Sequence, residues 1–226
     1  MNKTLIALIA FGIGLAVPAG VQAELREQAS GQDRHSPFMQ EFGQALPPIG
    51  HVGFCRRNPA ECVAEPVLHQ LFELSAEREQ EMREINALVN EVVKPVTDQE
   101  LYGRIEHWTY PAGKGDCEDY VLLKRRLLME RGWPASALLI TVVRDENGDG
   151  HAILTVRTDK GDFLLDNKHS QVITWNQSPY QFVKRQSHWD PQAWVSLKAP
   201  SLQHGDPTPV ARTKRDRIRH TARNSR

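Results

Sequence analysis

The sequence lacks an excess of either charge, has only three cysteines, and has no long apolar segment after its first residues. Its 28 Lys and Arg side chains balance 28 Asp and Glu side chains, and aromatic residues make up 7% of the 226 residues. These values exclude a wholly disordered chain and a collagen-like repeat, and the length suits one domain with a sizeable core. Because no apolar run outside residues 5–17 approaches the roughly 18 residues of a spanning helix, a polytopic membrane protein is also excluded. There is no glycine-rich phosphate loop and no zinc-type spacing of His and Cys.

The apolar run at residues 5–17 has the form of an export signal. Lys3 precedes it, and Val21-Gln22-Ala23 follows it with the small residues of a cleavage site. We therefore expect residues 1–23 to be a secretory signal peptide and the mature chain to begin at Glu24. The alternative is an uncleaved N-terminal anchor. Cleavage would release a protein that works outside the cytoplasm, where disulfides persist.

The balanced charge hides a basic C-terminal tail. Residues 210–226 contain seven Lys and Arg side chains and one Asp, which leaves the rest of the chain acidic. Such a tail could contact nucleic acid or an anionic membrane surface. It has no aromatic residue to stack on bases, however, and an acidic body would repel phosphates. We expect a disordered, solvated terminus and no nucleic-acid partner.

Cysteine spacing separates one pair from one single thiol. Cys55 and Cys62 flank the turn signal Asn58-Pro59, which predicts a small disulfide loop. This segment lacks the further ligands that a metal site would need. Cys117 is then the odd thiol, and an unpaired thiol in an exported protein requires a reason.

Hydrophobic periodicity predicts helices followed by strands. Apolar residues three and four apart predict an amphipathic helix from about Ser75 to before Pro95. A second helix is expected from Cys117 to Arg131, apolar around much of its circumference and therefore in the core, with Gly132 as its stop. Apolar, β-branched runs separated by turns predict strands at residues 137–143, 151–157, 162–166 and 172–175. This pattern predicts an α+β domain with an antiparallel meander packed on helices.

Cys117, His151 and Asp166 form the candidate catalytic group. Cys117 begins the predicted core helix, where the helix dipole favours a thiolate and free N–H groups can donate to an oxyanion. His151 opens a strand after a glycine-rich turn, and Asp166 ends the adjoining strand, so the two should lie within a few residues across the ladder. Taken singly, they have ordinary interpretations as a buried apolar thiol, an exposed histidine and a turn aspartate. Together with export they predict a thiol enzyme, because a nucleophilic thiol needs a base and the base needs an orienting group.

Three motifs of the chain resemble those of the bacterial transglutaminase-like cysteine proteinases. They are WTYPAGKGDCEDY at residues 108–120, GHAILTV at 150–156 and FLLDN at 163–167, and the resemblance spans about residues 50–197. The resemblance implies a papain-like, transglutaminase-like cysteine peptidase fold of the α+β class. In that fold the nucleophile lies at the N-terminus of a core helix packed on an antiparallel sheet.

The resemblance also implies roles and partners. It implies Cys117 as the nucleophile, His151 as the base and Asp166 as the group that orients the base. The best-understood relatives are periplasmic proteases that clip the N-terminal region of giant surface adhesins, often near paired alanines, and so release cells from biofilms. An inner-membrane receptor that senses cyclic di-GMP holds such proteases inactive. The resemblance thus implies a periplasmic location, a protein substrate, and an adhesin and a receptor as candidate partners, although that substrate belongs to one branch of the family.

A calcium site is a further implication of the resemblance. The adhesin-clipping relatives bind calcium near the cysteine motif, which implies Asp116, Glu118 and Asp119 as ligands, and carboxylates in a turn suit calcium. The alternative is that Asp116 caps the helix and Asp119 complements its dipole. Residues 145–150 match the first half of an EF-hand loop. Because Val156 stands where the closing Glu should be, that segment is predicted to be a hairpin turn.

The sequence therefore predicts an exported cysteine peptidase with a Cys117-His151-Asp166 triad. An amidase or transglutaminase with the same triad stays open, since the difference lies in the acceptor site, and so does an exported binding module that keeps the fold without turnover. The expected division is a signal peptide at 1–23, an N-terminal arm at 24–50, a transglutaminase-like cysteine peptidase domain at 51–198 and a basic tail at 199–226.

Overall fold

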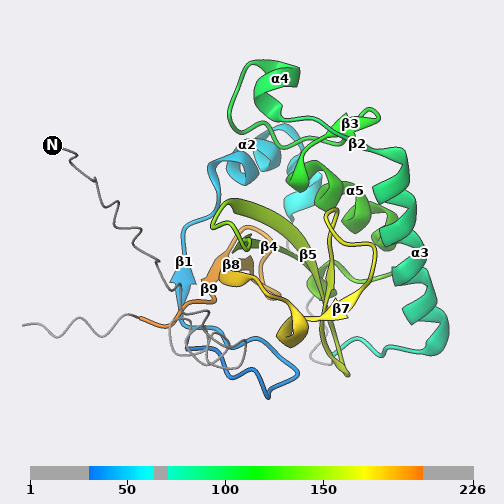
Figure 1. Ribbon diagram of the computed structural model, residues 1–226, viewed down its shortest axis with the longest axis vertical. Helices are drawn as coiled ribbons and strands as arrows, with labels where there is room; N and C mark the ends of the chain where they lie inside the picture. Colours follow the sequence, from blue (N-terminus) through cyan, green and yellow to red (C-terminus); the bar gives the residue numbers. More distant parts are fainter. Residues whose placement is uncertain (1–30, 64–70, 201–226) are drawn as a thin grey trace, which may run out of the picture.

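The computed structural model describes residues 31–63 and 71–200 (Figure 1). The predicted signal peptide, the first residues of the arm and nearly all of the basic tail lie outside these ranges. The helices are α2 (Ile49–Arg57), α3 (Ala76–Val92), α4 (Asp98–Tyr102) and α5 (Cys117–Glu130), with the 3-10 turns η1 (Pro59–Cys62), η2 (Ala135–Ala137) and η3 (Trp175–Gln177). The strands are β1 (Gln44–Ala45), β2 (Lys94–Pro95), β3 (Lys114–Gly115), β4 (Leu138–Arg144), β5 (Gly150–Thr158), β6 (Gly161–Leu165), β7 (Ile173–Thr174), β8 (Gln181–Gln186) and β9 (Trp194–Ser196).

The sheet confirms the predicted antiparallel meander and extends it. Strands β4, β5, β6 and β7 are neighbours in chain order, while β8, β9 and β1 continue the sheet on the other side of β4. Every pairing in this seven-stranded sheet is antiparallel. The short strands β2 and β3 form a separate parallel pair. The fold class is thus α+β, as the sequence predicted.

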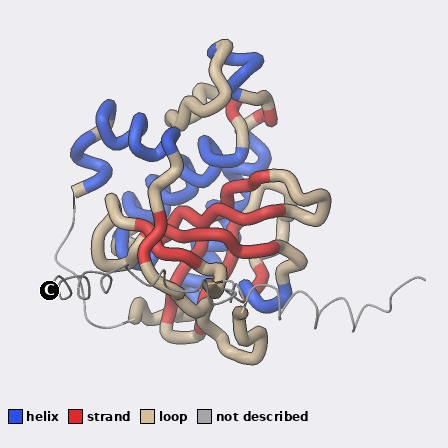
Figure 2. Tube along the Cα trace, turned by 90° about the vertical axis from the view of Figure 1, so that its left-hand side faces the viewer, coloured by secondary structure: helices blue, strands red, loops and turns tan. Residues whose placement is uncertain are grey.

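The two long helices cover one face of the sheet, and Figure 2 shows the helices gathered to one side of it. Helix α3 begins where expected, because the Ser75 hydroxyl caps it by accepting from the Arg78 amide at 3.2 Å. Leu122 and Leu128 of α5 join a buried cluster with alternate residues of β5, among them Leu154. The period of two residues in a strand sends the intervening Ile153 to a second cluster, on the other face. Both faces of the central strands are therefore buried.

Residues 31–45 take part in the second face. Met39 is 3% exposed and packs with Ile153 in the second cluster, and β1 pairs with β9 at one edge of the sheet. The Met39 amide also donates to the fully buried carboxylate of Asp162, which holds Arg185 at 2.9 Å. A buried charge persists in a fold only when it is paired and hydrogen-bonded in this way. The segment before α2 is therefore anchored to the sheet by a hydrogen bond to this buried ion pair as well as by apolar contacts.

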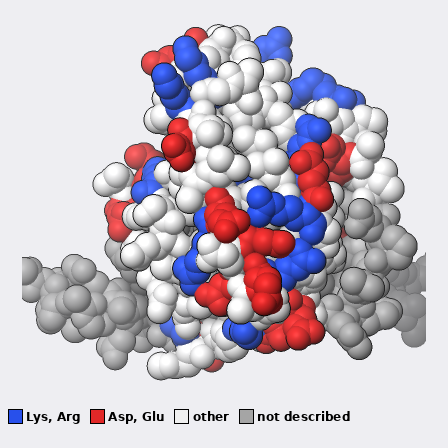
Figure 3. Space-filling view, turned by 90° about the vertical axis from the view of Figure 1, so that its right-hand side faces the viewer, with Lys and Arg blue, Asp and Glu red and all other residues white. Residues whose placement is uncertain are grey.

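The exposed surface over α3 carries both signs of charge. Figure 3 faces this side of the molecule and shows Lys and Arg interspersed with Asp and Glu. Arg78–Glu81 and Arg83–Glu79 are ion pairs one helical turn apart on α3. Among the described residues, no helix combines the length and the apolar character needed to cross a membrane.

Candidate active site

Cys117 is the first residue of α5 and touches the start of β5. Its sulfur accepts a hydrogen bond from the Ala152 amide at 3.4 Å, and its thiol faces the Glu118 carboxyl oxygen at 3.2 Å. The thiol belongs to a half-buried residue and is the free cysteine of the described chain. The N-terminus of the core helix and the first residues of β5 are thus in contact, as the motif order predicted.

His151 and Asp166 lie in direct contact. The Nε2 atom of His151 is 2.8 Å from Oδ1 of Asp166, and both side chains are buried. Strands β5 and β6 pair with Leu154 opposite Leu165, so His151 lies diagonally across the ladder from Asp166, on the same face. The predicted proximity of the two residues is confirmed. Asp166 engages Nε2 and leaves Nδ1 outside this contact.

Three groups besides His151 also hold Asp166 by hydrogen bonds. The Tyr180 hydroxyl donates to Oδ2 at 2.6 Å, and the Lys168 amide donates to Oδ1 at 2.9 Å. From α3, the Asn90 amide group donates to the Asp166 carbonyl oxygen at 2.8 Å. Burial would raise the pKa of Asp166, but the hydrogen bonds from His151 and Tyr180 outweigh it and lower this pKa to about 2. The carboxylate is therefore ionised at every physiological pH.

The environment of the Cys117 thiol differs from the expectation drawn from the helix dipole. Burial of the sulfur, followed by the negative charges of Glu118 and Asp116, raises the pKa of Cys117. The hydrogen bond from the Ala152 amide acts in the opposite direction. Burial of the sulfur, and after it the acidic side chains around the helix N-terminus, thus favour the protonated thiol.

Carboxylates converge beside Cys117 because β2 and β3 pair in parallel. The residues that follow the two strands lie side by side, so Asp98 of α4 reaches the start of α5. The Asp98 amide donates to Oδ2 of Asp116 at 3.0 Å, and carboxylate oxygens of Asp98, Asp116 and Glu118 lie within 4.8 Å of one another. Two of the predicted ligands, Asp116 and Glu118, are in this group. Asp119 lies beside it, with Oδ1 accepting from the Thr109 amide at 2.9 Å.

The hydrogen bonding of these acids does not match that of ordinary helix caps. Asp116 occupies the N-cap position, but its side chain makes no capping hydrogen bond. One oxygen each of Asp98, Asp116 and Asp119 is buried without a hydrogen-bond partner in the described structure. Burial, then the charge of Asp116, raises the pKa of Glu118 to about 9, and burial raises the pKa of Asp119 to about 7. Crowded carboxylates with unused oxygens fit a cation with oxygen ligands, such as calcium.

The other predicted metal-like segment is a turn. Residues 145–150 connect β4 to β5, and Oδ1 of Asp145 accepts from the amides of Asn147 and Asp149 at 3.0 and 2.9 Å. The second oxygen of Asp145 binds the Lys168 ammonium at 2.7 Å. Its oxygens are thus used within the protein, and the predicted hairpin turn is confirmed.

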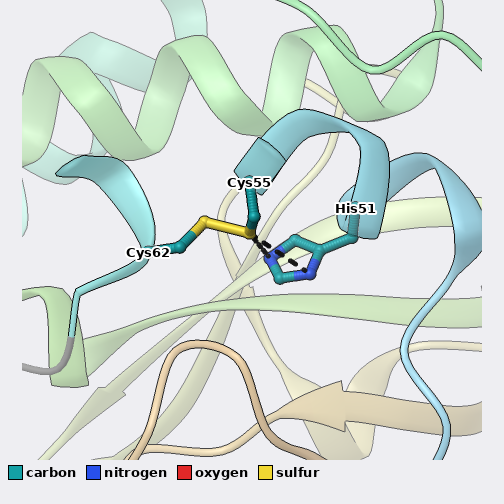
Figure 4. A group of neighbouring side chains, drawn as sticks. All are labelled: His51, Cys55 and Cys62. Carbon is teal, nitrogen blue, oxygen red and sulfur yellow. Dashed lines mark hydrogen bonds between the residues drawn. A yellow bond between two sulfur atoms is a disulfide. The ribbon is translucent and has the colours of Figure 1, made fainter. Parts of the chain in front are cut away.

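A second group of side chains that could bind a metal consists of the two cysteines of the predicted disulfide and His51 (Figure 4). Cys55 and Cys62 are bonded at 2.07 Å, as the spacing predicted, and His51 lies one helical turn before Cys55, with Nε2 3.6 Å from its sulfur. The His51 nitrogens face N–H donors, Trp194 at 3.4 Å and Gln186 at 3.5 Å. A metal-bound imidazole needs an acceptor at its second nitrogen, and thiolates must be free to bind. We therefore interpret this group as a disulfide packed on a histidine whose pKa burial lowers to about 4.

Two residues of the site had no signal in the sequence. Tyr180 follows a turn far from the other motifs, and Asp98 precedes the cysteine motif by a whole loop. Both reach the site only through tertiary pairing, Asp98 by the β2–β3 pair and Tyr180 by the position of β8 beside β4. Trp108, the first residue of the cysteine motif, is 3% exposed and packs edge-on against His51.

The chain matches a family model and is similar to several solved structures. A family model described as bacterial transglutaminase-like cysteine proteinase, BTLCP, matches residues 41–201. No curated protein matches the chain. Solved structures of LapG from Legionella pneumophila are similar at low identity. The calcium-bound form is 22% identical over 56% of this chain and 75% of that chain, with a TM-score of 0.46.

The EGTA-treated form of the same protein gives 23% identity over 47% of this chain, with a TM-score of 0.42. The match spans 62% of the length of that LapG chain. A third LapG structure gives 22% identity over 53% of this chain and 70% of that chain, with a TM-score of 0.45.

Proposed function

Since the chain belongs to the bacterial transglutaminase-like cysteine proteinase family, and hence to the cysteine peptidases, we propose that Cys117, His151 and Asp166 are its catalytic triad. The observation that carries the proposal is the set of contacts that links them. Ala152 donates to the Cys117 sulfur at 3.4 Å, and its chain neighbour His151 binds Asp166 at 2.8 Å. A thiol, an imidazole and a carboxylate in this order are the parts that acyl transfer requires.

The chemistry follows from the atoms that remain available. His151 takes the thiol proton on Nδ1, because Nε2 is engaged by Asp166. The Cys117 sulfur then attacks the peptide carbonyl carbon, and backbone N–H groups at the start of α5 donate to the oxyanion. His151 returns the proton to the leaving amine, which yields a thioester. Water attacks the thioester while His151 accepts its proton, and release of the acid restores the thiol.

Asp166 supports these steps without giving up a proton. Its ionised carboxylate fixes the Nε2–H form of the ring, so that Nδ1 presents a lone pair to the thiol. It also stabilises the imidazolium that forms when His151 takes the proton.

Calcium is the cation that the carboxylates beside Cys117 fit best. Asp98, Asp116 and Glu118 would hold it, and the buried, unpaired oxygens of Asp98 and Asp116 support this assignment. When bound, the ion would supply positive charge beside Cys117, which lowers the cost of forming a thiolate there. Glu118 lies 3.2 Å from the thiol and, together with burial of the sulfur, favours its protonated form.

Export and substrate complete the proposal. A signal peptide at residues 1–23 would deliver the chain to the periplasm, and the Cys55–Cys62 disulfide is typical of an oxidising compartment. The substrate is a protein, and the candidate is a large surface adhesin whose release would detach cells from a biofilm, with an inner-membrane receptor as regulator. Intact mass of periplasmic protein tests export, with a chain starting at Glu24 expected. A retained N-terminus would replace the signal peptide with an anchor.

Comparison of cells that carry the wild-type protein or Cys117→Ala tests the function. We expect a surface protein to appear in cleaved form in the medium only with the wild type, with a new N-terminus on the released fragment. A control Cys117→Ala sample should show an unchanged melting temperature, since the change removes one sulfur atom. Equal cleavage by both proteins would overturn the triad, and a product joined to an amine would show transamidation in place of hydrolysis.

A further inference from the structure

The geometry points to Tyr180 as a positioning residue of the reaction, whose hydroxyl sets the orientation of the Asp166 carboxylate toward His151; this inference rests on the triad proposed above. Tyr180 donates to Oδ2 at 2.6 Å, while His151 binds Oδ1 at 2.8 Å. Both the phenol and the carboxylate belong to buried residues. The chain of groups in the site is thus Tyr180, Asp166, His151 and then the thiol.

The two carboxylate oxygens of Asp166 accept from different donors, and this difference gives Tyr180 its role. Oδ1 receives two donors, the His151 ring and the Lys168 amide, whereas Oδ2 receives the phenol. A carboxylate with donors on one oxygen alone can turn about its Cβ–Cγ bond. The hydrogen bond from the phenol to Oδ2 opposes that rotation. It therefore keeps Oδ1 in line with the Nε2–H bond of His151. Hydrogen bonds to an ionised group are also the strong ones, which suits a group that must not move.

The backbone of Tyr180 is held on both sides. The Ser178 hydroxyl accepts from the Tyr180 amide at 3.2 Å, and the Tyr180 carbonyl accepts from the Arg34 guanidinium at 3.1 Å. The ring also lies edge-on to His151, with centroids 5.7 Å apart and planes at 79°. The phenol therefore touches two members of the triad from a fixed position, as a positioning residue requires.

A cavity beside this pair determines how much its loss should cost. A space of about 290 Å³ is lined by Asp166 and Tyr180, together with His169 and Ser178. Water from this cavity can take over the place of the hydroxyl when it is removed, although it cannot fix the carboxylate as a covalently held phenol does. The expected loss is therefore about tenfold, at the low end of the range for a hydrogen bond to a charged group.

The test is acylation of the full mature chain by p-nitrophenyl acetate in calcium-containing buffer, read as the burst of p-nitrophenol. For Tyr180→Phe we expect the acylation rate constant to fall about tenfold with ester binding changed less than twofold. The matched control is Thr174→Val, which removes a hydroxyl of β7 that bonds Asn176 and contacts neither Asp166 nor Tyr180, and it should keep the wild-type rate. An unchanged rate in Tyr180→Phe, or an equal loss in the control, would overturn the inference.

A double-mutant cycle separates positioning from mere structural support. If Tyr180 acts through the carboxylate, adding Tyr180→Phe to Asp166→Ala should leave the remaining rate unchanged within twofold. A further tenfold loss would show that the phenol acts in another way and would contradict the inference. The same assay on Cys117→Ala distinguishes the proposed triad from the proposed role of Tyr180. A burst that survives Cys117→Ala removes the triad itself, whereas inactive Cys117→Ala with unaffected Tyr180→Phe removes only the role of Tyr180.

A third variant covers the case in which Tyr180→Phe does not fold. The amino acid 4-aminophenylalanine at position 180 keeps the ring and places an N–H donor where the hydroxyl was. It should retain the wild-type rate within about threefold and the wild-type melting temperature. A folded protein with this donor and a tenfold lower rate would contradict the inference independently of the phenylalanine variant.

Discussion

Asp98→Asn discriminates between a cation site and a set of helix caps, because the two interpretations predict opposite signs in EGTA. Asp98 is 1% exposed, and its carboxylate oxygen lies within 4.8 Å of those of Asp116 and Glu118. At an effective dielectric constant of about 20, two negative charges at this separation repel by about 3 kcal/mol. The substitution removes one charge and leaves an amide oxygen to accept from the His107 amide, as the carboxylate does now.

The size of the stability change depends on which carboxylate beside Asp98 is ionised. Since the pKa of Glu118 is raised to about 9, Asp116 is the main repelling neighbour near neutral pH. We expect Asp98→Asn without metal to be about 3 kcal/mol more stable than the wild type, which is a melting shift of roughly 6–12 °C for a domain of this size. Calcium at 100-fold over its dissociation constant should stabilise the wild type by about 2.7 kcal/mol, and it should stabilise the variant less.

Differential scanning calorimetry in EGTA and in millimolar calcium measures both effects. Glu91→Gln is the matched control, because it neutralises an exposed acid of α3 that is not one of the clustered carboxylates, and it should shift neither melting temperature. A wild type that melts at the same temperature in both buffers, together with a destabilised Asp98→Asn, would refute the reasoning. The acids would then serve the fold through hydrogen bonds alone.

Three further predictions concern the disulfide, a close contact and pH. Replacing Cys55 and Cys62 together by Ser should lower the free energy of unfolding by about 2–3 kcal/mol in urea titrations, and a reduced wild type should match the variant; equal stability would contradict the bridge. Gly115→Ala should destabilise by about 1–3 kcal/mol by the same measurement, because an added Cβ would lie 2.5 Å from Oδ2 of Asp119. Asp166 has a pKa lowered in the folded state, so its contribution to stability is complete above its ordinary pKa of 3.8 and is lost as pH falls through about 2. Asp166→Asn should remove that part of the acid dependence in urea titrations between pH 5 and pH 2, and an unchanged dependence would show that the carboxylate is not ion-paired.

Local patterns carried much of the fold. Strands β4, β5 and β6 are continuous apolar runs bounded by turns, and α5 is apolar around most of its circumference, so period and turn residues sufficed to find them. Strand β8 escaped because Lys184 and Arg185 interrupt its pattern. Arg185 is fully buried against Asp162, and a buried ion pair cannot be read from one strand alone. The short strands β1 and β9 have two and three residues, too few for a period to appear.

Some residues of the candidate site could likewise be related from local sequence patterns, and others could not. His151 and Asp166 could be related from sequence because a hairpin joins neighbouring strands, and proximity across a hairpin follows from its short turn. The carboxylate group could be found only in part. Asp116 and Glu118 adjoin the cysteine, whereas Asp98 arrives through the parallel pair of β2 and β3, which are two residues long. No spacing rule connects residues brought together by so short a pairing.

The shortness of β1 and β7 has a consequence for the behaviour of the protein in a crowded compartment. These are the outer strands of the seven-stranded sheet, and each has only two residues. An exposed edge offers unpaired amides and carbonyls on which an extended chain can add as a further strand, and a two-residue edge offers almost none. Strand β1 pairs with Trp194 and Val195 of β9. Without β1, the edge of β9 that does not face β8 would be exposed. Loss of residues 31–45 should thus cause self-association through sheet edges before it causes loss of the triad.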